Sequence, residues 1–146
     1  MIRKIALLLL FSTMLFSSSK FTLDGVKNLK IMIVERTKFI DKEAKEELKS
    51  LIVKKLKKED FTFGEVDSTS FIIEIKAIEI KDLYVLEVSL FLGEDVKTNR
   101  KEKTDTFAYT YMQSVLVESE FLHEDTLNAV DFLVCQFLEA YRDDKE

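Results

Sequence analysis

Residues 71–92 read FIIEIKAIEIKDLYVLEVSLFL, two stretches with apolar residues at alternate positions on either side of Lys81 and Asp82. Alternation with a period of two predicts β-strands, and a two-residue connection predicts a tight hairpin. If Ile80 faces Leu83, the register brings one set of apolar side chains to the same face, because successive side chains of a strand point to opposite faces. This set comprises Phe71, Ile73, Ile75, Ala77, Leu86, Val88, Leu90 and Leu92. The hairpin therefore supplies one wall of the predicted core.

On the opposite face of this hairpin, Lys76 pairs with Glu87 and Glu74 with Ser89, whereas the residues nearer the turn are apolar. Four apolar side chains gather near the turn: Ile78, Ile80, Leu83 and Val85. An exposed group of this kind usually marks a contact surface. The alternatives are that segment 21–26 folds over these residues, or that a β-bulge turns them inward. We treat the four residues as a candidate partner contact.

Segments on both sides of the hairpin add strands and a helix. The continuous apolar run Leu29–Val34 predicts a strand covered on both faces, and residues 61–66 predict a short strand. Asp41 is a suitable N-cap for a helix over 41–58, in which acidic residues come first and lysines last. Residues 104–117 alternate again, which predicts a further strand.

The last segment changes to a helical pattern from Ser119 onward. The order of elements is therefore β-α-β-β-β-β-α. Each helix has one apolar face, which must be buried against the sheet. The sequence thus predicts an α+β two-layer sandwich, a mostly antiparallel sheet with two helices packed on one face, as a single domain over residues 20–146.

The first 19 residues have the features of a secretory signal peptide. Arg3 and Lys4 precede a largely apolar run over 5–16, and Ser17 and Ser19 supply small residues two positions apart. The run is shorter than the roughly 20 residues of a membrane-spanning helix. We therefore expect an exported, periplasmic protein with a cleaved signal over 1–19 and no transmembrane span in the mature chain.

The charge distribution argues against nucleic-acid binding. The net charge is −5, and residues 118–146 hold nine acidic and two basic residues, whereas phosphate contacts need clustered Lys and Arg. Basic side chains do gather in the segment 93–103, which we expect to be a polar loop: Lys97, Arg100, Lys101 and Lys103. The loop is either a solvated hairpin tip or a contact for an anionic glycan or lipid head group.

Few residues could support catalysis. His123 and Cys135 are twelve positions apart on or beside the last helix, roughly 18 Å, which is too far for a nucleophile and its base. We expect His123 at the surface and Cys135 at the edge of the apolar stripe. Three glycines leave no glycine-rich phosphate loop. We therefore predict that the protein is not an enzyme and has no cofactor or metal.

Two aromatic features remain. Phe107, Tyr109 and Tyr111 share one face of the strand over 104–117, and we expect them to pack in the core beneath a helix. Phe132 falls nearly opposite the apolar stripe of the last helix. Phe132 is therefore a fifth candidate partner contact, unless a loop covers it.

The order of elements resembles that of small envelope proteins, including the lipopolysaccharide-assembly partner lipoproteins and the amino-terminal domain of the periplasmic Tol translocation protein. The lipoprotein cysteine of the first group is missing here. We expect a non-enzymatic binding or assembly module of the cell envelope whose partner is an envelope protein. The alternatives are a structural homo-oligomer and, less favoured, a small hydrolase or metal-dependent enzyme that uses His123.

Overall fold

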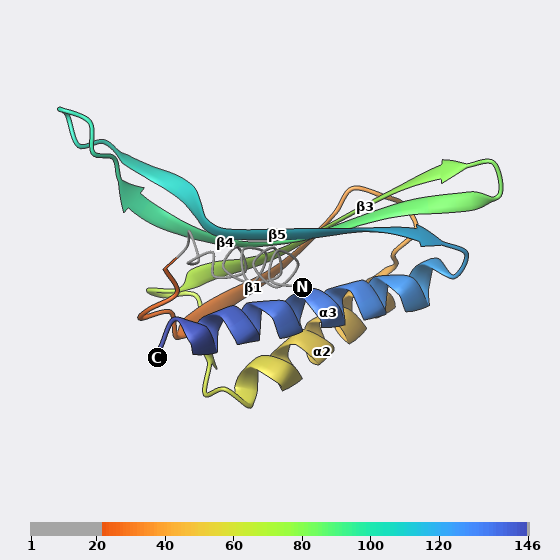
Figure 1. The fold of residues 1–146 in the computed structure, drawn as a ribbon, viewed down its shortest axis with the longest axis horizontal. Helices are drawn as coiled ribbons and strands as arrows, with labels where there is room; N and C mark the ends of the chain where they lie inside the picture. The colour runs from red at the N-terminus through yellow and green to blue at the C-terminus, as the bar shows by residue number, and fades with distance from the viewer. Residues whose placement is uncertain (1–21, 146) are drawn as a thin grey trace, which may run out of the picture.

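The computed structural model describes residues 22–145, which form a five-stranded sheet covered on one face by two helices (Figure 1). The predicted α+β two-layer sandwich is thus confirmed, whereas the predicted signal over 1–19 lies outside the described residues. In chain order the elements are β1 (Asn28–Glu35), α2 (Lys42–Lys57), β2 (Thr62–Phe63), β3 (Thr69–Ile80), β4 (Leu83–Lys97), β5 (Asp105–Ser119) and α3 (Leu122–Asp143).

The strands lie in the order β2-β1-β3-β4-β5. β3, β4 and β5 follow one another as antiparallel neighbours, so the sheet is mostly antiparallel, as predicted. β1 runs parallel to both β2 and β3, and α2 lies between β1 and these strands in the chain. A parallel pair needs such a crossover, because a tight turn can join only antiparallel strands.

The β3–β4 hairpin has the predicted register. Ile80 pairs with Leu83 and Phe71 pairs with Leu92. Lys81 occupies the left-handed region with a φ of 61°, which lets the chain reverse within two residues. This hairpin extends beyond the layer of helices at one end of the molecule (Figure 1).

The core lies between the sheet and the two helices. The ring of Phe137 on α3 is at its centre, with ring centroids 5.2 Å from Phe71, 5.5 Å from Tyr111 and 5.9 Å from Phe61. Aromatic pairs at these distances contribute packing beyond the area that they bury. The other fully buried side chains of the core include Leu48, Ile52, Leu56, Ile73, Ile75, Leu86, Val88, Leu90, Leu92, Val130, Leu133 and Val134.

The first helix begins where the sequence predicts. Asp41 Oδ1 accepts a hydrogen bond from the backbone N–H of Ala44 at 2.8 Å, which satisfies one of the free donors at the start of α2. Lys55 interrupts the apolar face of α2, and its ammonium leaves that face to contact Asp131 on α3 at 2.6 Å.

The described part of segment 21–26 does not cover the hairpin. Leu23 and Val26 are buried in the core, and Asp144, just after α3, accepts hydrogen bonds from the backbone N–H groups of Leu23 and Asp24. Residues 22–26 are thus held at the carboxyl-terminal end of α3. The turn of the hairpin lies near the other end of that helix, because Tyr84 pairs with Ser119 on β5, three residues before α3 begins.

Two predicted boundaries are wrong. Residues 93–97 belong to β4 rather than to a loop, which spans only 98–104. Glu94 links the strands here, because Thr69 on β3 and Thr110 on β5 both donate hydrogen bonds to its carboxylate. The predicted strand over 61–66 is reduced to β2, Thr62–Phe63.

The prediction that the strand over 29–34 is covered on both faces is also wrong. Leu29 is buried on the helix side, but Met32 is exposed on the other side. Within residues 22–145, both helices lie on one face of the sheet, so no helix covers the other face (Figure 1).

Candidate functional site

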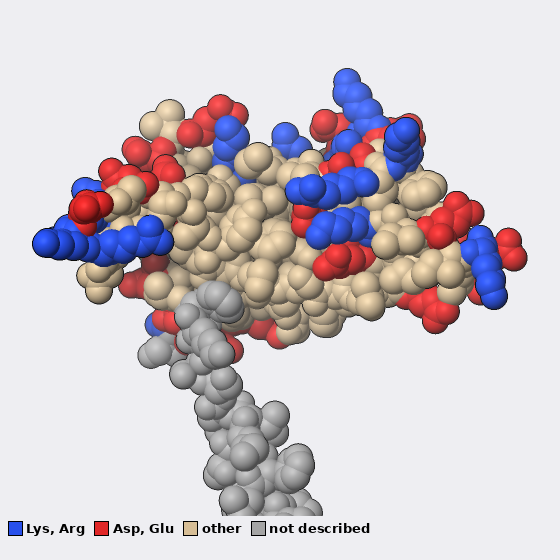
Figure 2. Space-filling model, turned by 90° about the horizontal axis from the view of Figure 1, so that it is seen from above, with Lys and Arg blue, Asp and Glu red and all other residues tan. Residues whose placement is uncertain are grey.

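The sheet face that points away from α2 and α3 is the main surface left open by the fold. In Figure 2, which looks down on the sheet from this side, uncharged residues form a broad area, with charged residues gathered mainly beside it. Three zones follow from the strand register: a hairpin patch (Ile78, Ile80, Leu83 and Val85), a polar band (Arg36, Glu74, Lys76, Glu87, Ser89 and Ser114) and an aromatic patch (Met32, Ile72, Phe91, Phe107, Tyr109 and Met112).

The hairpin patch contains four of the five contact residues proposed from the sequence. Ile78 and Ile80 are 65% and 55% exposed, and Leu83 and Val85 are half-buried. Ile78 pairs with Val85 and Ile80 with Leu83, so the four side chains form two adjacent cross-strand pairs. The hydrogen-bonded strands fix the positions of these side chains.

The polar band separates the hairpin patch from the aromatic patch. Glu74 lies at its centre, 2.6 Å from Arg36 Nε and 3.0 Å from Lys76 Nζ, and Lys76 also contacts Glu87 at 3.5 Å. The hydrogen bond from Lys76 lowers the pKa of Glu74, and burial of the carboxyl group acts in the opposite direction. The hydrogen bond from Arg36 lowers the pKa further, so the pKa of Glu74 lies below its ordinary value. The band is therefore a charge network that lies between the two apolar patches.

The aromatic patch crosses four strands. Met32, Ile72, Phe91 and Met112 occupy one continuous cross-strand row. Tyr109 stacks on Phe91 with ring centroids 4.6 Å apart, and Phe107 meets Tyr109 edge to face at 6.0 Å. Phe107 and Tyr109 remain 51% and 56% exposed, so this zone is a second apolar surface that sequence reasoning missed.

A β-bulge explains why Phe107 and Tyr109 are not in the core as predicted. Leu92 pairs with Tyr111, but Gly93 pairs with Tyr109, so Thr110 is an extra residue on β5. An extra residue shifts the alternation by one position. Tyr111 therefore faces Phe137 in the core, while the two preceding aromatic residues face outward. The signal in the sequence was Gly93, since glycine inside a strand pattern often marks a bulge.

Phe132, the fifth proposed contact residue, is exposed on α3. Because α3 lies in the helical layer, Phe132 does not join the hairpin patch on the sheet. The structure thus brings four of the proposed residues together and leaves the fifth on a separate surface.

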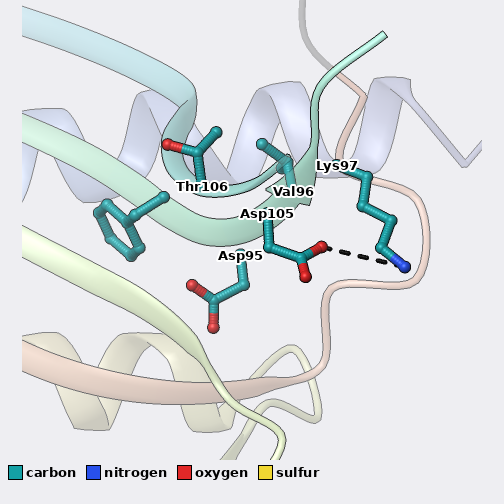
Figure 3. A pocket seen from close by; sticks show the side chains of 6 residues that line it. Asp95, Val96, Lys97, Asp105 and Thr106 are labelled. Atoms are coloured by element: carbon teal, nitrogen blue, oxygen red, sulfur yellow. Dashed lines mark ion pairs between the residues drawn. The ribbon is translucent and has the colours of Figure 1, made fainter. Parts of the chain in front are cut away.

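The end of the β4–β5 hairpin has a shallow hollow lined by Asp95, Val96, Lys97, Asp105, Thr106 and Phe107 (Figure 3). Lys97 Nζ lies 3.9 Å from Asp105 Oδ1. The carboxylates of Asp95 and Asp105, together with the ammonium of Lys97, give the hollow mixed charge. Arg100, Lys101 and Lys103 are exposed in the turn beyond it.

His123 and Cys135 contact different groups. His123 Nε2 is 3.1 Å from Glu47 Oε2 at the surface, whereas Cys135 Sγ is 2.9 Å from Lys55 Nζ between the helices. Burial would lower the pKa of Lys55, but its contacts with Asp131 and Cys135 outweigh that effect and raise it. Across residues 22–145, no group of three or more His, Cys, Asp or Glu side chains is arranged to hold a metal ion.

No known protein family model matches the chain, and no curated protein matches it either. The fold therefore defines the class: an α+β domain with two helices on one face of a five-stranded sheet and two apolar patches on the other. Neither α2 nor α3 is both long and apolar enough to cross a membrane.

Proposed function

We propose that the protein is an exported, non-enzymatic binding or assembly module of the cell envelope, which holds a partner protein on the hairpin patch. The observation that carries this proposal is the exposure of Ile78 and Ile80 on a hydrogen-bonded hairpin that extends beyond the helices. Covering the exposed part of these side chains favours a complex by about 25 cal/mol for each Å² of apolar surface removed from water. A partner that covers the patch therefore gains affinity at little cost in conformational freedom.

The envelope location rests on the amino-terminal sequence. The charged start at Arg3 and Lys4, the apolar run over 5–16 and the small residues that follow it favour export. Fusion of residues 1–30 to a reporter that is active only outside the cytoplasm should give activity. The same fusion with Leu8→Arg and Leu9→Arg should give none, and equal activity of both fusions would contradict export.

The partner contact is tested by substitution in the hairpin patch. Ile80→Lys together with Leu83→Lys should preserve the fold, because Ile80 is exposed and Leu83 is half-buried, and should abolish crosslinking of an envelope protein to a probe at residue 79. Val66→Lys is the matched control, since Val66 is exposed on another part of the chain. Unfolding of the double variant would show that the patch is part of the core, and unchanged crosslinking by a folded double variant would place the partner elsewhere.

The basic turn at the end of the β4–β5 hairpin is a further candidate contact, for an anionic glycan or lipid head group. Exposed Arg100, Lys101 and Lys103 support it, whereas Asp95 and Asp105 oppose it. Binding to anionic vesicles that disappears in high salt and in Arg100→Ser plus Lys101→Ser would support this contact. Equal binding of both proteins would contradict it.

A further inference from the structure

The outer edge of β5 is the longest open hydrogen-bonding edge of the sheet. β5 spans Asp105–Ser119 and pairs only with β4 among the described residues, whereas the opposite edge strand, β2, has two residues. An unpaired edge offers a row of backbone donors and acceptors to another strand.

This edge lacks the residues that usually prevent such pairing. Residues 106–117 contain no Lys, Arg, Asp, Glu or Pro. Edge strands in monomeric proteins are typically protected by charged residues, by Pro or by shortness. The bulge at Thr110 interrupts the edge, and the regular uncharged part therefore runs from 111 to 117, with Ser114 at its midpoint.

We infer that two copies of the chain associate through β5, which pairs antiparallel with β5 of the second copy about a two-fold axis at Ser114. In this register Met112 of each copy faces Leu116 of the other on the sheet face away from the helices. These side chains are 54% and 70% exposed in the single chain. Each of these side chains therefore gains one apolar neighbour, and the pair of Met112 with Leu116 occurs twice in the dimer. No like charges face one another within residues 111–117.

The side of α3 that would face the second copy is uncharged. Lys55 on α2 contacts Asp131 and Cys135 on one side of α3. A rotation of about 100° per residue puts an uncharged set on the opposite side, toward the edge of the sheet. This set comprises Leu122, Ala129, Gln136 and Ala140.

The expected distance between the α3 helices of the two copies also agrees with a dimer. α3 contacts both β4 and β5, so its axis lies beneath that pair of strands. With strands about 4.8 Å apart, the two copies of α3 would lie about 10 Å apart, close to the usual separation of packed helices. A second copy can therefore pair with β5 in the sheet and also pack its α3 against α3 in the helical layer. An extended peptide could only pair with β5. This self-association uses a surface separate from the hairpin patch.

The first test is the mass of the purified protein in solution. Sedimentation equilibrium should give about twice the monomer mass, and Leu116→Lys should give a monomer of unchanged helix and strand content. Ile78→Lys is the matched control on β3 and should remain a dimer. A monomeric wild type, or loss of the dimer in the control alone, would overturn the inference.

The register is tested by cysteine crosslinking in a Cys135→Ala background. Ser114→Cys should form an intermolecular disulfide on mild oxidation, because directly facing residues of antiparallel strands lie within disulfide reach. Met112→Cys should crosslink to Leu116→Cys in a mixture, but neither should crosslink to itself. Self-crosslinking of Met112→Cys as efficient as that of Ser114→Cys would contradict pairing about Ser114.

Discussion

Phe107 on β5 lies directly over Gly93 on β4, so closely that a Cβ atom at position 93 would overlap its ring. Gly93 stands beside the bulge at which β5 gains Thr110. The missing side chain lets the ring of Phe107 pack on the backbone, and the bulge turns that ring out of the core. The contact therefore links the bulge to the aromatic patch.

Gly93→Ala should displace Phe107 and lower the free energy of unfolding by about 1 kcal/mol, because the added methyl group overpacks the site. Chemical denaturation would measure this cost. The cost should largely disappear in a Phe107→Ala background, since the ring that meets the methyl group is then absent. An equal cost in both backgrounds would show that Gly93 is needed for its backbone rather than for this contact.

Glu74 should make stability depend on pH. Its pKa in the folded protein is below the ordinary value of 4.5, because of Lys76 first and Arg36 second, with burial opposing them. A carboxyl group whose pKa is lowered by folding stabilises the folded state at pH values above its ordinary pKa. This stabilisation is lost as the pH falls through the pKa of the folded state.

Glu74→Gln should therefore lower the free energy of unfolding by about 1 kcal/mol at neutral pH and flatten its decline below pH 4.5. Denaturation midpoints at a series of pH values would measure both effects. Glu79→Gln, at an exposed position on the same strand, is the control. If the free energy of unfolding falls as steeply with pH in Glu74→Gln as in the wild type, Glu74 is not the source of the pH dependence.

Asp144 should hold the amino-terminal segment to the end of α3. Its carboxylate accepts hydrogen bonds from the backbone N–H groups of Leu23 and Asp24. Asp144→Ala removes both acceptors and should cost about 1–2 kcal/mol, with faster hydrogen exchange at Leu23. Asp144→Asn keeps one acceptor oxygen and should be intermediate. Unchanged exchange at Leu23 in the alanine variant would mean that burial of the Leu23 side chain alone fixes this segment.

Much of the fold could be predicted from the sequence because its signals are local. The two-residue turn at Lys81 and Asp82 fixes the register of β3 and β4, and Asp41 fixes the start of α2. The alternation along β3 and β4 also separated a core face from the face that carries the hairpin patch.

The errors occurred where the outcome depends on distant residues. Gly93 and the charges after it predicted a loop, but pairing with β5 extends β4 to Lys97. Phe107 and Tyr109 share a period of two with Tyr111, and only the extra residue Thr110 turns them outward. A bulge depends on the register between two strands, so the alternation along β5 alone does not predict it.

The sequence by itself determined the two-layer architecture, the hairpin register and the apolar residues of the hairpin patch, since period-two alternation, a tight turn and a helix cap act over a few neighbouring positions. Only the tertiary structure decided which patches stay open. Both helices pack on one face, residues 22–26 are held at the end of α3, and the bulge turns Phe107 and Tyr109 to the other face. Those outcomes depend on contacts between segments that are far apart in the chain, and such contacts leave no periodic pattern in any one segment.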